Sequence, residues 1–189
     1  MNQLMFFVLF SMLLASCNTS LSDKEIRAYK EKGAIISKST GAELSGTLTN
    51  KMKSGGLVEA VEFCNTAALP LTQKMADSFG VEIKRTSLKT RNPLNKPSEN
   101  EELILREFEA NVEKGIPLEP IVRLDQYGNP NYYAPVLVEK KCLICHGTLD
   151  QELSRAADSI IKSHYPDDLA TGFKEGDLRG IWSISFSKS

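Results

Sequence analysis

The sequence predicts an α+β fold with a mostly antiparallel sheet and a long helix at its start. Apolar residues follow helical spacing through residues 22–80, whereas the alternation typical of strands appears mainly after them. The turn residues 127–130 (Tyr-Gly-Asn-Pro) stand between two strand-like runs, 120–124 and 132–138, and predict a hairpin. Helices followed by strands with helices inserted are typical of the α+β class rather than of an all-helical protein.

Two helices are expected before residue 80. Ser22 and Glu25 form a capping-box pattern, so the first helix should begin there and end at the break Ser54-Gly55-Gly56. Pro70 restarts or kinks the second helix, and Gly80 ends it. The second helix carries apolar residues on one face, namely Leu57, Val61, Cys64 and Ala68. This spacing turns the thiol on that face toward the interior of the protein.

The later elements alternate between strands and helices. Residues 81–86 alternate as a strand does. Residues 98–115 predict a helix, since they open with a second capping box and end in a glycine. Another helix is expected from about residue 149 to 162, followed by a polar, turn-rich stretch from 164 to 180. The chain closes with a half-buried strand in which serines alternate with Trp182, Ile184 and Phe186.

The composition indicates one exported domain. The 189 residues include 23 basic and 24 acidic side chains, for a net charge of −1, which argues against nucleic acid or an anionic membrane surface as partner. The apolar run 4–15 is too short for a membrane-spanning helix, which needs ~20 residues. It fits the apolar part of a secretory signal, so residues 1–16 are expected to be a signal peptide.

The expected signal ends in Leu-Ala-Ser-Cys, residues 14–17, which resembles a bacterial lipobox. The resemblance implies cleavage before Cys17 and lipid on its thiol. Residues 17–21 are then expected to form a tether, and residues 22–189 a single domain. The alternative is an ordinary signal cleaved nearby, which leaves Cys17 as a free thiol. We expect a lipoprotein on the periplasmic side of a bacterial membrane, which it contacts through the lipid anchor only. Asn18 favours the outer membrane, because it does not resemble the Asp that retains lipoproteins at an inner membrane.

Cys142-Leu143-Ile144-Cys145-His146 has the C-x-x-C-H spacing of c-type haem attachment. Two thiols at this spacing reach the two vinyl groups of one haem, and the adjacent imidazole binds the iron. One alternative is a thioredoxin-like dithiol, which does not need the histidine. The other is a zinc site, which would have to recruit Cys64 and a histidine. The sequence therefore predicts one covalent haem c held by Cys142 and Cys145, with His146 as iron ligand.

Cys64 is left without an assigned partner among the four cysteines. If Cys17 carries lipid and the other two cysteines carry haem, no thiol remains for a disulfide, although the expected compartment is oxidising. Its place on an apolar helix face leaves two interpretations, an inert buried thiol or a metal ligand.

Six stretches together resemble one known family. They are Val61–Cys64, Lys84–Leu88, Arg91–Pro97, Tyr132–Pro135, Cys142–Gly147, and Tyr165–Asp168 continuing through Gly176–Gly180. In this order they are similar to the c-type haem domain family with a PAS-like fold, long catalogued as a domain of unknown function. The resemblance implies a PAS-like antiparallel sheet with flanking helices. It also implies an iron held by His146 on one side and Cys64 on the other. Apart from the resemblance, the alternatives for the second position are His164 and a methionine such as Met52 or Met75.

Cations and aromatic residues in these stretches are candidates for the haem pocket. Because buried carboxylates need paired charge, the expected partners of the haem propionates are Arg85, Arg91 and Arg179, with Lys84 as a fourth cation. The alternative for each is ordinary surface charge. Two further pocket candidates precede the haem motif on one strand, and since they alternate in direction only one should face the haem. These are Tyr132 and Tyr133.

The expected role is redox or diatomic-gas sensing through a signalling partner. A thiolate ligand favours ferric iron, so we hypothesise that Cys64 leaves the iron on reduction and opens a site for CO or NO. One alternative is a periplasmic electron-transfer cytochrome with a redox partner protein. A haem peroxidase-like enzyme is the other, and because no distal acid–base residue is evident we expect no enzymatic activity. A second copy of the chain, paired through the long first helix, is a further candidate partner.

Overall fold

The computed structural model describes residues 20–186. The expected signal peptide, residues 1–16, and the expected lipidation site, Cys17, lie outside these residues. Within the described range, no helix has both the length and the apolar character needed to span a membrane. Of the expected tether only the last two residues are described, and Leu21 packs against the main core.

Five helices and four strands follow one another along the described residues. The helices are α1 (Asp23–Thr66), α2 (Ala68–Phe79), α3 (Glu99–Glu113), α4 (Leu143–His146) and α5 (Arg155–His164). The strands are β1 (Glu82–Thr86), β2 (Ile121–Leu124), β3 (Pro130–Leu137) and β4 (Leu178–Ser185). All strand pairs are antiparallel, in the order β1-β4-β3-β2. The expected PAS-like α+β fold with flanking helices and a long N-terminal helix is confirmed.

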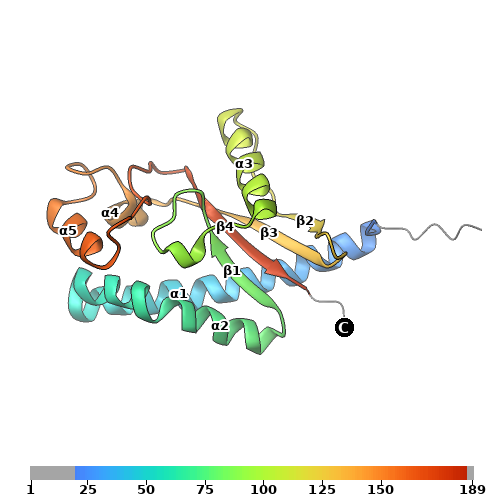
Figure 1. The fold of residues 1–189 in the computed structure, drawn as a ribbon, viewed down its shortest axis with the longest axis horizontal. Coiled ribbons are helices and arrows are strands. Elements are labelled where there is room, and N and C mark those ends of the chain that lie inside the picture. The colour runs from blue at the N-terminus through green and yellow to red at the C-terminus, as the bar shows by residue number, and fades with distance from the viewer. Residues whose placement is uncertain (1–19, 187–189) are drawn as a thin grey trace, which may run out of the picture.

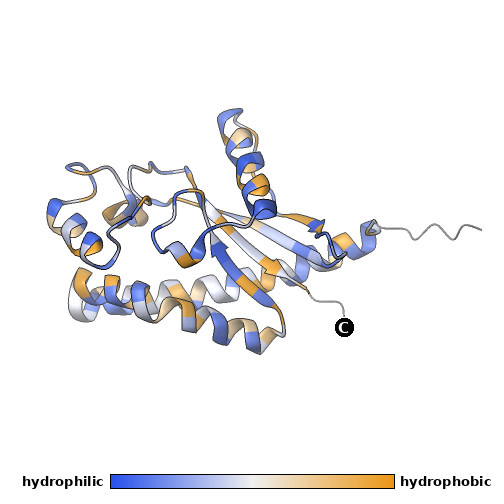
Figure 2. Cartoon of the chain, viewed as in Figure 1, coloured by the Kyte–Doolittle hydropathy of each residue, from blue (hydrophilic) through white to orange (hydrophobic). Residues whose placement is uncertain are grey.

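Helices cover both faces of the sheet (Figure 1). α1 and α2 lie on one face, where their apolar side chains meet Tyr132 and Ile184 in the main core. α3 stands on the opposite face, where Phe108 packs with Tyr133 in a second core. Figure 2 shows hydrophilic and hydrophobic residues alternating along α2 and α3, as expected of helices with one buried face. α4 and α5 lie at one end of the sheet, beyond β3 and β4 (Figure 1).

α1 contains a sharp reversal at Gly56. This glycine has φ 66° and ψ −152°, a backbone conformation that is essentially restricted to glycine. Figure 1 shows the chain doubling back there, so that the later part of α1 and then α2 run beside the earlier part. The break expected at Ser54-Gly55-Gly56 is confirmed. The reversal places Cys64 on the returning part of the helix.

We expect Gly56→Ala to lower the free energy of unfolding by about 1–2 kcal/mol, because an alanine is strained in this conformation. Gly46→Ala is the matched control on the same helix, since a Cβ added there would meet nothing within 4 Å. Alanine should stabilise that helical position by about 0.5–1 kcal/mol. Urea unfolding followed by circular dichroism measures both variants. Equal effects of the two substitutions would contradict the special role of Gly56.

Both expected capping boxes are confirmed. Ser22 and Glu25 open α1, and Ser98 and Glu101 open α3, in each case through reciprocal bonds between side chain and backbone. Gly80 ends α2 with φ 64°, the left-handed conformation expected of a helix-ending glycine.

Two boundaries differ from the sequence expectation. The helix expected at 149–162 begins only at Arg155, because the Ser154 hydroxyl caps it by accepting the Ala157 N–H at 3.2 Å. The last strand begins earlier than expected, at Leu178, because it pairs along the whole length of β3. Long-range pairing therefore converts the end of the turn-rich stretch into strand.

Candidate functional site

Four segments that are distant in the sequence meet at one end of the sheet. They are the returning part of α1, the loop 87–95 after β1, the turn 140–147 after β3, and the loop 165–173 before β4. The loop 165–173 holds two of the others together through backbone bonds. Its Leu169 N–H donates to Thr90 at 3.0 Å, and its Phe173 N–H donates to His146 at 3.0 Å.

The C-x-x-C-H segment forms a single tight turn. A 3-10 helix (Lys140–Cys142) leads directly into α4. Both cysteines are half-buried free thiols. Cys142 packs against the small core that contains Phe173, and Cys145 packs against the one that contains Tyr165. Residues three apart on a helical turn share one side of it, so both thiols are available to one binding partner.

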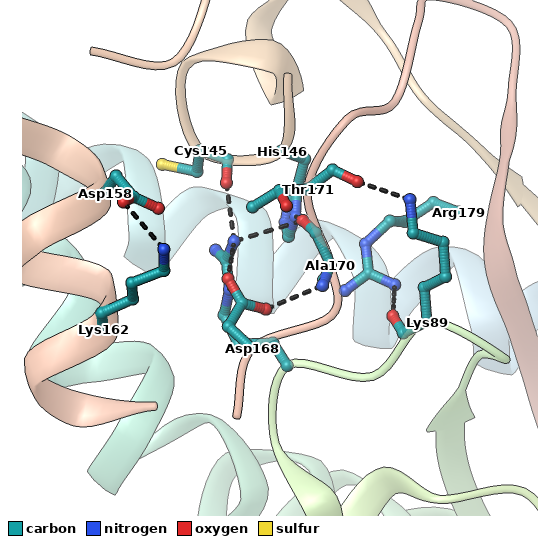
Figure 3. A network of polar contacts seen from close by, with 10 residues as sticks. Lys89, Cys145, His146, Asp158, Lys162, Asp168, Ala170, Thr171 and Arg179 are labelled. Carbon is teal, nitrogen blue, oxygen red and sulfur yellow. Dashed lines mark hydrogen bonds and ion pairs between the residues drawn. The ribbon is translucent and has the colours of Figure 1, made fainter. Parts of the chain in front are cut away.

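His146 is held in one tautomer by a backbone carbonyl. Its Nδ1 lies 2.7 Å from the oxygen of Ala170, and because a carbonyl can only accept, Nδ1 donates (Figure 3). Burial, followed by the charges of Arg179 and Arg91, lowers the pKa of His146 well below its usual value, although the bond to Ala170 opposes this shift. The imidazole is therefore neutral at neutral pH, with the lone pair of Nε2 available to a metal.

Arg91 is held by an acidic residue that sequence reasoning missed. Its Nε and Nη2 donate to Oδ2 of Asp168 at 3.1 and 2.9 Å. The two side chains are only 12% and 1% exposed, so each charge needs the other. Arg91 also donates to the carbonyls of Cys145 and Ala170. Arg91 is thus already paired with a carboxylate, and its expected contact with a haem propionate stays a prediction.

The other expected arginines are differently placed. Within residues 20–186, no carboxylate forms an ion pair with Arg85 or Arg179. Arg85 stands 5.8 Å from the centre of the Trp182 ring. Arg179 lies over Phe173, and burial followed by the charges of Arg85 and Arg91 lowers its pKa to about 10. These two arginines remain available to a bound carboxylate.

Lys84, the fourth expected cation, is paired with a carboxylate. It forms a 2.7 Å ion pair with Glu101, whose side chain is 8% exposed. It therefore links β1 to the start of α3, and it also lines the cavity described next.

Cys64 is half-buried and borders a cavity of about 100 Å³ between α2, β1 and the loop after β1. Arg85 lines the same cavity. Burial raises the pKa of the Cys64 thiol, while the charges of Arg85 and Arg91 oppose this rise. Burial raises the pKa of the Cys145 thiol, the charge of Arg91 opposes this rise and the charge of Cys64 adds to it, as expected if the third thiol lies near the C-x-x-C-H turn.

Tyr165 is an aromatic residue at this end of the sheet that sequence reasoning missed. Tyr132 and Tyr133 do face opposite sides of the sheet, and each packs in a core, against α1 and α3 respectively. The expectation that one of them faces the haem stays a prediction. Burial, with the charge of Cys64 as the next cause, raises the pKa of Tyr165 to about 12. Strand alternation alone could not reveal it, because it lies in a loop.

The weaker candidates for a second ligand do not line the cavity beside Cys64. His164 ends α5, where its Nδ1 lies 3.2 Å from the carbonyl of Ile160. Met52 and Met75 do not line the cavity beside Cys64. In the part of the chain that the structure describes, no three His, Cys, Asp or Glu side chains gather so as to hold a metal ion. The four-ligand zinc alternative thus has no preformed cluster there.

Comparison with known proteins places the chain in a family. A family model described as Tll0287-like matches residues 15–187. Among solved structures, the fold resembles the crystal structure of the cyanobacterial heme-protein Tll0287, with a TM-score of 0.58 and 22% sequence identity. That match covers 89% of this chain and 98% of the other. A search of the curated proteins found no match. The family match over nearly the whole length shows that this chain belongs to the Tll0287-like family.

Proposed function

We propose that this protein binds one haem c, attached through Cys142 and Cys145, with His146 and Cys64 as iron ligands. The observation that carries the proposal is the state of His146. Directly after two free thiols on one turn, it keeps Nδ1 on the Ala170 carbonyl and leaves Nε2 unbonded. Membership of a family whose solved relative is described as a heme-protein supports the same cofactor.

The residues present fit this group. Two thiols can form the thioether links, and a neutral imidazole and a third thiol can serve as ligands from different elements. The unpaired cations Arg85 and Arg179 can hold the propionates, since buried carboxylates require opposite charge. When bound, the haem supplies one-electron chemistry and an iron that can take up a diatomic ligand.

We further propose that the protein senses redox state or a diatomic gas for a partner protein. Cys64 supports this, because a thiolate stabilises ferric iron and loses its advantage on reduction. The cavity beside Cys64 offers its side chain space to move, and Arg85 at that cavity can stabilise a thiolate. Export and lipid anchoring through Cys17 are part of the proposal and are supported by the sequence pattern alone.

An electron-transfer cytochrome is the second candidate function. The observation that favours it is the outer surface of the attachment turn. Ile144, between the two cysteines, is 48% exposed and borders a shallow hollow of about 430 Å³. An accessible apolar residue beside a cofactor suits brief contact with a redox partner.

Cys64→Ala tests the ligand assignment. We expect the ferric protein to give a low-spin electron paramagnetic resonance signal of the thiolate type, and the variant to lose it. His164→Ala is the matched control and should keep the signal, because His164 is bonded within α5. A thiolate-type signal that survives in Cys64→Ala would contradict the assignment.

The same variant separates sensing from electron transfer. If Cys64 must leave before CO enters, the reduced wild-type protein should bind CO more slowly than Cys64→Ala does. Stopped-flow absorbance after mixing with CO measures both rates. Equal rates would contradict the release of Cys64 and favour the electron-transfer function.

A further inference from the structure

We propose that Arg91 and Asp168 are positioning residues for His146, which fix the carbonyl bonded to its imidazole and thereby set how strongly its Nε2 donates. This inference rests on the proposed function, because it concerns His146 as an iron ligand. It assigns to Arg91 a role other than the propionate contact expected from the sequence.

The guanidinium of Arg91 contacts both the peptide group before His146 and the carbonyl that is bonded to its ring. Nη2 of Arg91 donates to the carbonyl of Cys145 at 2.6 Å, which is the peptide group directly before His146. The same nitrogen lies 3.3 Å from the carbonyl of Ala170, which accepts the Nδ1–H of His146 at 2.7 Å. Arg91 therefore ties the backbone of the histidine to the group that orients its ring.

Asp168 completes the arrangement from the other side. Its Oδ2 accepts from Arg91, and its Oδ1 accepts the N–H of Ala170 at 2.8 Å. Ala170 is thus held at both its N–H and its C=O, as Figure 3 shows for the contact with Asp168. Because both charged side chains are nearly excluded from water, these charge-assisted bonds are strong and directional.

The arrangement has a chemical consequence at Nε2. An imidazole whose N–H is bonded to a good acceptor becomes a more basic metal ligand. The cation of Arg91 on the same carbonyl makes that carbonyl a weaker acceptor. Arg91 therefore moderates the basicity of His146, while Asp168 keeps the acceptor in place.

Arg91 could instead act only through its positive charge, and two variants distinguish these mechanisms. Arg91→Met removes a positive charge near the iron, and Asp168→Asn removes a negative one. Charge alone predicts that the reduction potential falls in the first variant and rises in the second. Positioning predicts that both variants release Ala170 and so broaden the range of orientations of the His146 ring, whichever way the basicity of Nε2 changes.

The test uses the full haem-loaded chain, with ferric electron paramagnetic resonance and redox titration as readouts. We expect Arg91→Met and Asp168→Asn both to broaden or split the low-spin signal. Arg91→Lys should restore it only in part, since an ammonium lacks the planar fork with which the guanidinium meets the carboxylate and the carbonyls. Arg106→Met and Glu102→Gln break an exposed pair on α3 and should leave the signal unchanged.

Each outcome has a defined meaning. Unchanged signals with opposite shifts of the potential would reduce Arg91 and Asp168 to plain charges and overturn the inference. Unchanged signals and potentials would overturn it as well. If Arg91→Met or Asp168→Asn does not fold, Arg91→Lys keeps the charge pair, and a wild-type signal in that variant would overturn the proposal. Absence of a thiolate-type signal in the wild-type protein would instead contradict the proposed ligand set.

Discussion

Serine at both Cys142 and Cys145 should leave the protein without any haem that survives denaturation. The proposed haem c would stay attached through two thioether bonds at these thiols, and a hydroxyl cannot form such a bond. Haem staining of a denaturing gel, or extraction of the pigment with acidified acetone, measures the retained fraction. We expect complete loss in Cys142→Ser/Cys145→Ser, and partial retention when only one cysteine is replaced.

Cys64→Ala is the matched control for that experiment. It removes a third thiol from the same end of the molecule but should leave the covalently bound haem in place, because Cys64 is proposed to bind iron and not the vinyl groups. Retention of haem in the double serine variant after denaturation would refute attachment at this motif. Loss of haem in Cys64→Ala would show that the roles of the cysteines are assigned wrongly.

Valine at Gly33 should destabilise the fold by about 3 kcal/mol or more, at the upper end of the cost of overpacking a core. A Cβ at this position of α1 would overlap the ring of Tyr132, a residue that is only 1% exposed. Gly33→Ala should cost less, about 1–3 kcal/mol, because alanine adds one carbon and favours the helix. Chemical denaturation monitored by circular dichroism gives both values.

Gly41→Ala provides the comparison on the same helix. A Cβ at Gly41 would lie 3.6 Å from the Trp182 ring, an ordinary contact, so alanine should be neutral or stabilise by up to about 1 kcal/mol. Similar destabilisation by alanine at both positions would show that helical glycines matter for a reason other than the close approach of Tyr132.

Local sequence patterns were enough to predict most of the elements and part of the site. The capping boxes, the hairpin turn and the C-x-x-C-H turn each depend on residues within a few positions of one another. Helical spacing also placed Cys64 on an inward face, although only the resemblance to a family suggested a role for it. The predictions of these features succeed because each feature depends on short-range geometry.

The remainder depends on contacts that no local pattern encodes. Arg91 and Asp168 are 77 positions apart, and only the closing of the sheet brings them together. Strand alternation correctly separates Tyr132 from Tyr133, but it cannot reveal that both lie in the sheet cores while Tyr165 reaches the site. The pairing of β4 with β3 likewise overrides the turn-like composition of residues before Gly180.

The bond from His146 to Ala170 implies an order of assembly. If Cys142 and Cys145 take the haem, the reaction needs only one short segment of chain, which ends at residue 146. The acceptor that orients the imidazole lies 24 residues later and is secured by Arg91 from far upstream. Such distant contacts form late, because long loops must close first. Attachment can therefore precede folding, whereas the final ligand geometry matures only when the last strand joins the sheet.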